Sequence, residues 1–290
     1  MELRDLRYFM ETAVEGNMSR AAEKLHVSQP VISKQLKELE EELGVILFTR
    51  TNYGIRLTEE GLLLREKAAD ILALSDQTEA LFKNSDDLSA GNIYIGLAEA
   101  RSMIRIAEVM FTLRQKHPGI LCNTFSGNLS ELSERLDKGL LEFAVVSNYV
   151  DQNRYNFLTL PDKEHWGILA KKGDPLTEKV SLSVEDLFTL PLICSVQWLD
   201  LDVPLWIRDQ RKLNITATYT LFYNAAVLVR AGLGYAVVYD GLIDKDNDSD
   251  LTFIPLCDAP EQSMFIIWRK NRTFTPAASA FLQELLDHFG

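Results

Sequence analysis

The chain of 290 residues is 47% hydrophobic and 25% charged, which is typical of a globular protein with enough apolar side chains for two or three domains. Its 30 basic and 42 acidic side chains give a net charge of -12, so any contact with DNA phosphates has to be local. The three cysteines lie far apart and form no CxxC pair, so we expect no disulfide framework, metal or cofactor. Without a signal peptide or an apolar run of about 18 residues, we expect a cytoplasmic protein that contacts no membrane.

The first 58 residues predict three short helices followed by a hairpin. They carry 8 basic and 9 acidic side chains and are therefore nearly neutral. Apolar residues at three- and four-residue steps predict a first helix from Leu3 to Gly16. Ser19 is predicted to cap a second helix, and Ser28 to cap a third, which has Pro30 in its first turn. The following run of β-branched and aromatic residues around the sequence TNYG predicts a hairpin.

Two short helices joined by a tight turn form a helix-turn-helix, whose second helix enters the major groove of DNA. On that helix Gln29, Ser33 and Lys37 follow at four-residue steps, opposite the apolar stripe. Glutamine pairs with adenine, and lysine reaches guanine or phosphate. Acidic side chains crowd only the C-terminal half of the helix, so its N-terminal half can approach DNA. The candidate DNA contacts are Ser19, Arg20, Gln29, Pro30, Ser33, Lys34, Lys37, Arg50, Asn52 and Arg56.

A three-helix pattern also occurs in small bundles that bind no DNA, so the residue identities have to decide. Four segments read AAEKLHVSQPVISKQL, LEEELG, LFTR and LTEEG. They closely resemble the N-terminal domain of LysR-type transcriptional regulators, and the resemblance continues more weakly through Pro118, 136–143 and 228–238. It implies a winged helix-turn-helix, a dimerising linker helix and an effector domain built like a type 2 periplasmic binding protein. Tyr53 departs from the pattern, because the family's wing commonly has an arginine there.

Pattern and resemblance together predict an α/β multidomain protein that binds double-stranded DNA and a small-molecule effector. The predicted parts are a DNA-binding domain at 1–58, a linker helix at 59–87 and an effector domain at 91–290, with lobe I at about 91–161 and 267–290 and lobe II at about 162–266.

The linker region favours a long helix from Thr58 to Phe82, with apolar residues near heptad spacing. In a monomer such a seam would leave apolar surface exposed, so we expect a homodimer. The candidate dimer contacts are Leu64, Ala68, Ile71 and Phe82. The family resemblance also implies that dimers pair into a homotetramer through the effector lobes.

Beyond residue 91, short strands alternate with helices in the rhythm of a parallel sheet covered by helices. The predicted strands are 92–97, 120–125, 143–147, 166–170, 192–194, 216–220, 235–238 and 264–269. The predicted helices are 102–116, 129–138, 184–188, 204–211, 223–231 and 276–289. Isolated histidines and the lack of HExxH, GxSxG or GxxxxGK[ST] argue against an enzyme. A solute-binding module without a DNA-regulatory role is the alternative.

A small molecule between two lobes would meet the carboxyl ends of strands and the first turns of helices. The candidate effector contacts are Glu99, Ala100, Ser102, Asn128, Ser147, Ser195, Phe222 and Asn224. In LysR-type regulators the turn after the first effector-domain strand commonly offers hydroxyl groups to a carboxylate. Here Ala98, Glu99 and Ala100 take those positions, which favours an amine-bearing or neutral polar effector over a carboxylic acid. Alternatively, Glu99 only complements the dipole of its own helix and points to solvent.

Overall fold

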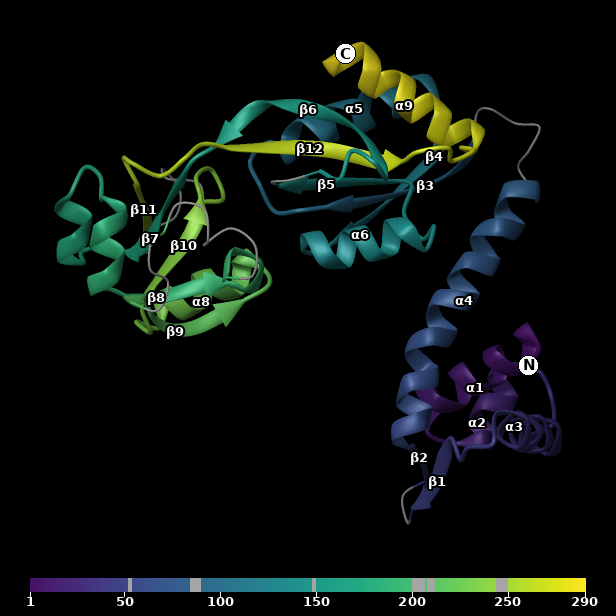
Figure 1. The fold of residues 1–290 in the computed structure, drawn as a ribbon. Coiled ribbons are helices and arrows are strands. Elements are labelled where there is room, and N and C mark those ends of the chain that lie inside the picture. Colours follow the sequence, from purple (N-terminus) through teal and green to yellow (C-terminus); the bar gives the residue numbers. More distant parts are fainter. Residues whose placement is uncertain (52–53, 84–89, 148–149, 200–206, 208–211, 244–249) are drawn as a thin grey trace. The chain divides into compact units, whose positions relative to one another are not determined.

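The computed structural model describes residues 1–51, 54–83, 90–147, 150–199, 207, 212–243 and 250–290. The chain divides into two compact units, residues 1–83 and residues 84–290 (Figure 1). Within the described residues, no helix has the length and apolar character needed to cross a membrane.

The first unit contains four helices and a two-stranded hairpin among its described residues. They are α1 (Leu3–Glu15), α2 (Met18–Lys24), α3 (Gln29–Leu43), β1 (Phe48–Thr51), β2 (Gly54–Leu57) and α4 (Glu59–Lys83). Left-handed Gly16 and Gly44 end α1 and α3, as glycine does at helix C-termini. The cap of α2 differs from the prediction. Extended Asn17, not Ser19, begins the helix, and its side chain accepts the N–H groups of Ser19 and Arg20.

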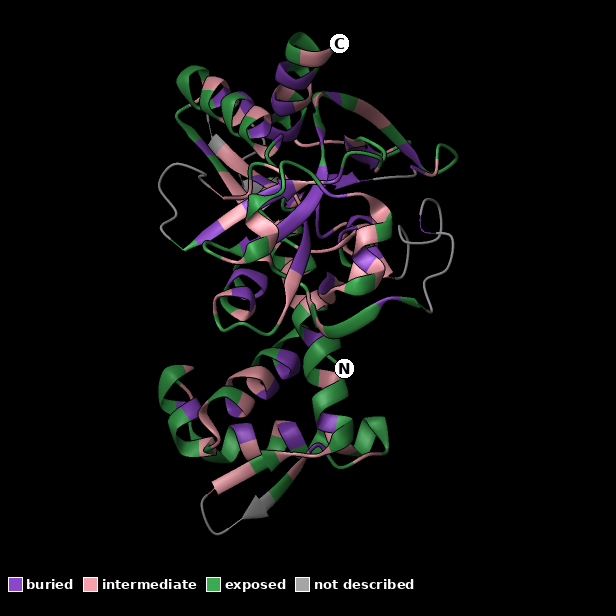
Figure 2. Ribbon diagram, turned by 90° about the vertical axis from the view of Figure 1, so that its left-hand side faces the viewer, coloured by how far each residue is buried: buried purple, intermediate pink, exposed green. Residues whose placement is uncertain are grey.

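The apolar faces of these helices meet in one core, seen as purple stretches on the helices of the unit that carries the N label in Figure 2. Phe9, Ile32 and Ala68 are fully buried in this core. Helix α4 therefore packs with the other helices of residues 1–83, which we call the head. The predicted dimer contact at Ala68 is therefore wrong, because this side chain has no surface left for a second chain. Leu64 also packs partly against this core. Ile71 and Phe82, by contrast, are 37% and 78% exposed.

The hairpin is tied to the helices on both sides of its strands. The Glu40 carboxylate on α3 accepts the N–H groups of Leu47 and Phe48 at 2.7 and 3.2 Å. The Thr58 hydroxyl accepts the N–H of Gly61 at 3.0 Å in the first turn of α4, and donates to the Ile46 carbonyl at 2.6 Å. The hairpin, α3 and α4 are thus held together by Glu40 in the last turn of α3 and by Thr58 directly before α4.

Lobe I of the second unit is a five-stranded sheet in the order β4-β3-β5-β12-β6. Its strands are β3 (Ala90–Leu97), β4 (Gly119–Ser126), β5 (Phe143–Ser147), β6 (Tyr155–Glu164) and β12 (Gln262–Arg269), and its helices are α5 (Met103–Lys116), α6 (Leu129–Asp137) and α9 (Pro276–Phe289). Helices α5 and α9 cover one face and α6 the other (Figure 1). Phe281 of α9 and Phe143 of β5 are fully buried and contact each other, with 5.0 Å between their ring centroids.

Lobe II is a second five-stranded sheet, in the order β11-β7-β10-β8-β9. Its elements are β7 (Trp166–Lys171), η1 (Pro175–Glu178), η2 (Val184–Thr189), β8 (Pro191–Ser195), β9 (Asn214–Tyr219), α8 (Phe222–Arg230), β10 (Tyr235–Tyr239) and β11 (Leu251–Pro255). Helix α8 buries Ala225, Ala226 and Val229 against one face, while Trp198 and Leu187 are buried on the other.

The sheets are mixed, not parallel as predicted, because β12 runs antiparallel to β5 and β6, and β7 runs antiparallel to β10 and β11. Strands β6 and β11 were not predicted. The expected lobe limits at 161/162 and 266/267 are also displaced, since β6 stays paired with β12 up to Glu164 and Gln262. Pro161 did not end the strand because β6 is an edge strand with an irregular register there. Most of the predicted helix 204–211 lies outside the described residues.

Candidate functional site

The exposed face of α3 gathers the polar side chains that the sequence proposed for reading DNA. Gln29, Lys34 and Lys37 are exposed, and Ser33 is half-buried, while Ile32 and Leu36 fill the core behind them. Gln29 Nε2 makes only a weak contact, 3.9 Å from the Met18 sulfur. The helix therefore presents a row of side chains that a major groove can accept.

The cations around this face are partly engaged within the chain. Lys34 lies 3.6 Å from Glu38, and Lys37 lies 3.3 Å from Glu41. Arg20 donates a hydrogen bond to the backbone carbonyl of Glu15. Exposed pairs of this kind contribute at most about 1 kcal/mol, so phosphates can compete for the same cations.

The remaining candidate DNA contacts lie around α3. Ser19, Pro30 and Arg56 are exposed. Arg50 lies on β1, and neither its side chain nor Asn52 belongs to the described part of the chain. The structure thus places an exposed arginine, Arg56, on the second strand of the hairpin.

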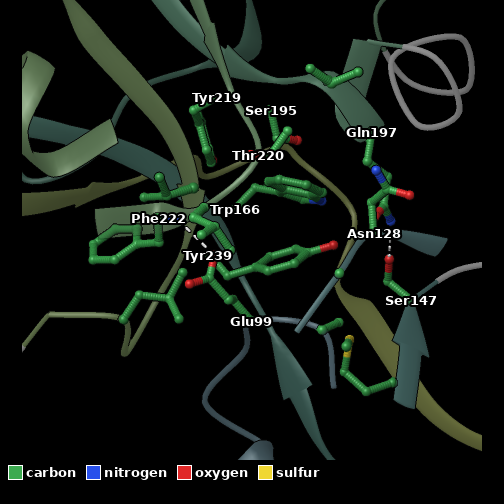
Figure 3. Close-up of a pocket in the computed structure, with 17 residues that line it drawn as sticks. Glu99, Asn128, Ser147, Trp166, Ser195, Gln197, Tyr219, Thr220, Phe222 and Tyr239 are labelled. Atoms are coloured by element: carbon green, nitrogen blue, oxygen red, sulfur yellow. Dashed lines mark hydrogen bonds between the residues drawn. The ribbon is translucent and has the colours of Figure 1, made fainter. Parts of the chain in front are cut away.

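The second unit contains a cavity of about 80 Å³ where its two lobes meet (Figure 3). Lobe I contributes the ends of β3, β4 and β5, and lobe II contributes the ends of β8 and β9 with the start of α8. The described residues that line it are Ala98, Glu99, Gly127, Asn128, Ser147, Trp166, Ser195, Val196, Gln197, Tyr219, Thr220, Leu221, Phe222, Val238, Tyr239, Leu242 and Met264.

Two side chains cross this cavity in opposite directions. Gln197 of lobe II donates from Nε2 to the Ser147 hydroxyl at 2.8 Å, and its Oε1 accepts the Leu129 N–H of lobe I at 3.1 Å. Glu99 of lobe I accepts the Phe222 N–H of lobe II at 2.6 Å, at the start of α8. Dashed lines in Figure 3 mark the bonds from Gln197 to Ser147 and from Phe222 to Glu99.

Aromatic rings form the cavity wall between Gln197 and Glu99. The rings of Trp166 and Tyr239 lie 4.2 Å apart between their centroids, in the middle of Figure 3. The Tyr219 hydroxyl donates to the Val237 carbonyl at 2.8 Å. Burial, with smaller effects of Cys194 and Glu99, raises the pKa of the Tyr219 phenol, so it stays neutral at any physiological pH.

The comparisons with known proteins agree along the whole chain. Residues 3–62 match the model of the bacterial regulatory helix-turn-helix proteins of the lysR family, and residues 86–290 match the LysR substrate binding domain. The chain belongs to the LysR family.

Relatives of this LysR-family chain are named as transcriptional regulators. A probable RuBisCO transcriptional regulator of Trichormus variabilis is 26% identical, across 99% of this chain and 88% of that protein. The uncharacterized HTH-type transcriptional regulator YnfL of Escherichia coli is 25% identical, across 99% of this chain and 98% of that protein. The structure of full-length CbnR with its target DNA is similar in fold, with a TM-score of 0.75 and 21% identity over 99% of this chain and 100% of that chain.

The predicted class is thereby confirmed: the chain is a LysR-family DNA-binding transcriptional regulator with a substrate-binding domain, and the quoted relatives are regulators, not enzymes. The alternative of a solute-binding module without a DNA-binding role is set aside by the match of residues 3–62.

Five of the predicted effector contacts line the regulator's cavity, and three do not. Glu99, Asn128, Ser147, Ser195 and Phe222 lie on it. Ala100 is 7% exposed within the lobe I core, and Ser102 is fully buried at the start of α5. Asn224 is exposed on α8, because only the first residue of that helix turns toward the cavity.

The alternative that Glu99 only complements the dipole of its own helix is wrong, while its effect on the choice of effector stays a prediction. Glu99 caps the first turn of α8, on the opposite lobe, and not its own helix. The start of α5 is filled instead by the fully buried Glu164, which accepts the N–H groups of Arg101 and Ser102 at 3.3 and 2.9 Å.

Gln197, Tyr219 and Tyr239 line the cavity but were not predicted from the sequence. Gln197 follows β8 directly, so the rule that ligands meet strand ends could have included it. Tyr219 and Tyr239 end β9 and β10, where the same rule applies.

Proposed function

We propose that this regulator changes its control of transcription when a small molecule binds the cavity between its two lobes. The observation that carries the proposal is a pair of side chains that form hydrogen bonds with the opposite lobe. Gln197 of lobe II bonds to lobe I, and Glu99 of lobe I bonds to lobe II. A ligand that replaces or adds to these hydrogen bonds favours one arrangement of the lobes over another, and its effect equals its difference in affinity for the two.

We propose that α3 reads the DNA sequence and that the surrounding cations hold the backbone. Gln29, Ser33 and Lys34 contact base edges, while Lys37 and Arg56 contact phosphates, together with Arg50 and Asn52. Ser19 and Arg20 lie in the first turn of α2 and Pro30 lies in the first turn of α3, and they contact the DNA backbone from there. The exposure of Gln29 and Arg56 supports this division.

We propose that the regulator works in the cytoplasm as a homodimer joined through α4, and that dimers pair through their effector domains. Exposed apolar side chains on α4 support the first contact, since Ile71, Leu74 and Phe82 are 37%, 43% and 78% exposed. Leu64 is partly covered by the head, and Ala68 takes no part.

A mobility-shift assay with DNA from upstream of the regulator's own gene tests the function as a whole. We expect a shift with that fragment at protein concentrations that leave unrelated DNA free, and a changed shift on addition of an effector. Gln29→Ala should lose the preference for the fragment. Equal binding to both DNAs by the wild-type protein would contradict sequence-specific regulation.

A further inference from the structure

We propose that the effector carries a positive charge, as a protonated or quaternary amine, and binds beside the Glu99 carboxylate against the aromatic wall of the cavity. This rests on the proposed function, because it names the chemistry of a ligand in the cavity already described. The charge of the lining, the helix starts around it and its aromatic rings each support it.

Among the described residues that line the cavity, Glu99 carries the only charge, and none is lysine, arginine or histidine. A carboxylate or phosphate that entered this cavity would lose its water shell. It would find no positive charge on the lining, and the negative charge of Glu99 would repel it. Such transfer is costly unless the ion is paired. An ammonium group meets the opposite situation, because the Glu99 carboxylate on the lining has the opposite charge and is exposed.

The starts of helices are the other places where an anion could bind, and the chain's own oxygen atoms occupy those of α5, α6 and α8. At α5, Glu164 accepts two N–H groups. At α6, the Asn128 side chain accepts the Glu131 N–H, and Gln197 accepts that of Leu129. At α8, Glu99 accepts the Phe222 N–H at 2.6 Å. An anionic effector would have to displace one of these acceptors.

The rings favour the same ligand class. Trp166 and Tyr239 contact each other at a tilt of 40° in the cavity wall between Glu99 and Gln197, and Tyr219 and Phe222 also line it (Figure 3). Cations are attracted to the faces of such rings, tryptophan most strongly. Glu99 itself has one hydrogen bond from the described part of the chain, the one from Phe222, so a carboxylate oxygen can also accept one from an ammonium group.

The remaining polar groups indicate what else the ligand carries. The hydroxyls of Ser147 and Ser195 and the amide groups of Asn128 and Gln197 lie on the side away from Glu99 (Figure 3). They are neutral hydrogen-bonding groups, suited to a hydroxyl or amide on the far end of the ligand. The volume of about 80 Å³ limits the ligand to a small molecule.

The test compares ligands that differ only in charge, on the purified full-length regulator. Three sets share one carbon skeleton each: propylamine, propanol and propionate; butylamine, butanol and butyrate; benzylamine, benzyl alcohol and benzoate. Thermal unfolding screens all nine, and calorimetric titration measures the affinity of each that stabilises the protein. The variants are Glu99→Gln, whose amide oxygen can still accept the Phe222 N–H, and Glu178→Gln, a control that removes the same charge from an exposed residue outside the cavity lining.

We expect the amines to stabilise the wild-type protein and to bind about tenfold more weakly to Glu99→Gln, with no change in Glu178→Gln. Stabilisation by the carboxylates or alcohols without the amines would overturn the charge assignment and leave the cavity as the effector site. Equal amine binding by wild type and Glu99→Gln would overturn it too. If none of the nine compounds stabilises the protein, both the charge assignment and the cavity as effector site fail.

Discussion

The fully buried carboxylate of Glu164 accepts the backbone N–H of Ser102 at 2.9 Å and thereby joins the end of β6 to the start of α5. The donors at the start of a helix have no partners within the helix itself, so a side chain has to supply one. In lobe I the acceptor comes from 62 residues further along the chain. Glu164 is thus a structural residue of lobe I.

Removing that acceptor should destabilise the effector domain. Glu164→Ala leaves the buried N–H group of Ser102 without its acceptor, which costs about 1–3 kcal/mol of unfolding free energy, and also removes the acceptor of the part-buried Arg101 N–H. Urea unfolding followed by circular dichroism measures this loss. Glu178→Ala, on an exposed 3-10 helix, is the control and should change little. Equal stability of the two variants would show that the buried carboxylate contributes nothing.

Glu142 should make the stability of lobe I depend on pH. Burial raises the pKa of its carboxyl above 4.5, although the Tyr94 N–H and Arg272 favour the charged form. A carboxyl with a raised folded-state pKa holds its proton more tightly when folded, so the unfolding free energy falls as the pH rises from 4.5 through the folded-state pKa.

The glutamine variant isolates this effect, because Glu142→Gln does not titrate. The unfolding free energy of Glu142→Gln minus that of wild type should therefore grow as the pH rises from about 4.5 to about 7. Urea unfolding of both proteins at several pH values gives the difference directly. A constant or shrinking difference would mean that burial does not dominate at this residue.

Gln197 should protect the first amide of α6 from exchange with solvent. Its Oε1 accepts the Leu129 N–H at 3.1 Å across the cavity. Gln197→Ala removes about 1 kcal/mol of protection, so exchange at Leu129 should become roughly fivefold faster, as measured by hydrogen–deuterium exchange. Gln152→Ala, on an exposed residue, should leave the rate unchanged. Equal exchange rates at Leu129 in wild type, Gln197→Ala and Gln152→Ala would contradict the hydrogen bond between Leu129 and Gln197.

Two substitutions in the head should separate base reading from phosphate binding. Gln29→Ala should cost about 1–3 kcal/mol on the preferred DNA site and little on random DNA. Arg56→Ala should weaken binding to both DNAs and reduce the dependence of affinity on salt concentration. Fluorescence anisotropy on the two DNAs at several salt concentrations measures both. The same pattern for both variants would show that the roles are assigned wrongly.

The exposed side of α4 should carry the dimer contact. Phe82→Glu and Ile71→Glu place a charge among apolar side chains, so we expect dimer dissociation constants at least about tenfold higher, measured by light scattering. Lys67→Glu changes the charge on the same helix and should leave association intact. Ala68→Glu should instead unfold the head, because this residue is fully buried there. If Phe82→Glu and Ile71→Glu keep the molar mass of the wild-type oligomer, the dimer contact lies elsewhere on the chain.

The sequence predicted the helices of the head well because their ends are marked by local chemistry, such as Gly16, Gly44 and Thr58. It could not predict that Ala68 is buried, since a small apolar residue on a long helix fits a dimer seam and a packed head equally well. Strand β6 was not predicted because it contains Pro161, and proline interrupts a strand unless that strand lies at the edge of a sheet. Whether a strand lies at the edge depends on the whole sheet. Glu99 was found from the chain, but its partner Phe222 lies 123 residues away, a distance in sequence over which no local rule operates.

The anchoring of the hairpin determines how motion can reach DNA. Glu40 fixes the wing to α3, Thr58 fixes the wing to α4, and Ala68 fixes α4 to the core. Among the described residues of 1–83, α4 packs on α1, and α1 in turn packs on α3, the helix proposed to read DNA. Turning α4 about its axis therefore turns α3 by the same angle, and in a dimer joined through α4 the crossing angle of the two helices determines the distance between the base pairs that the two heads can read.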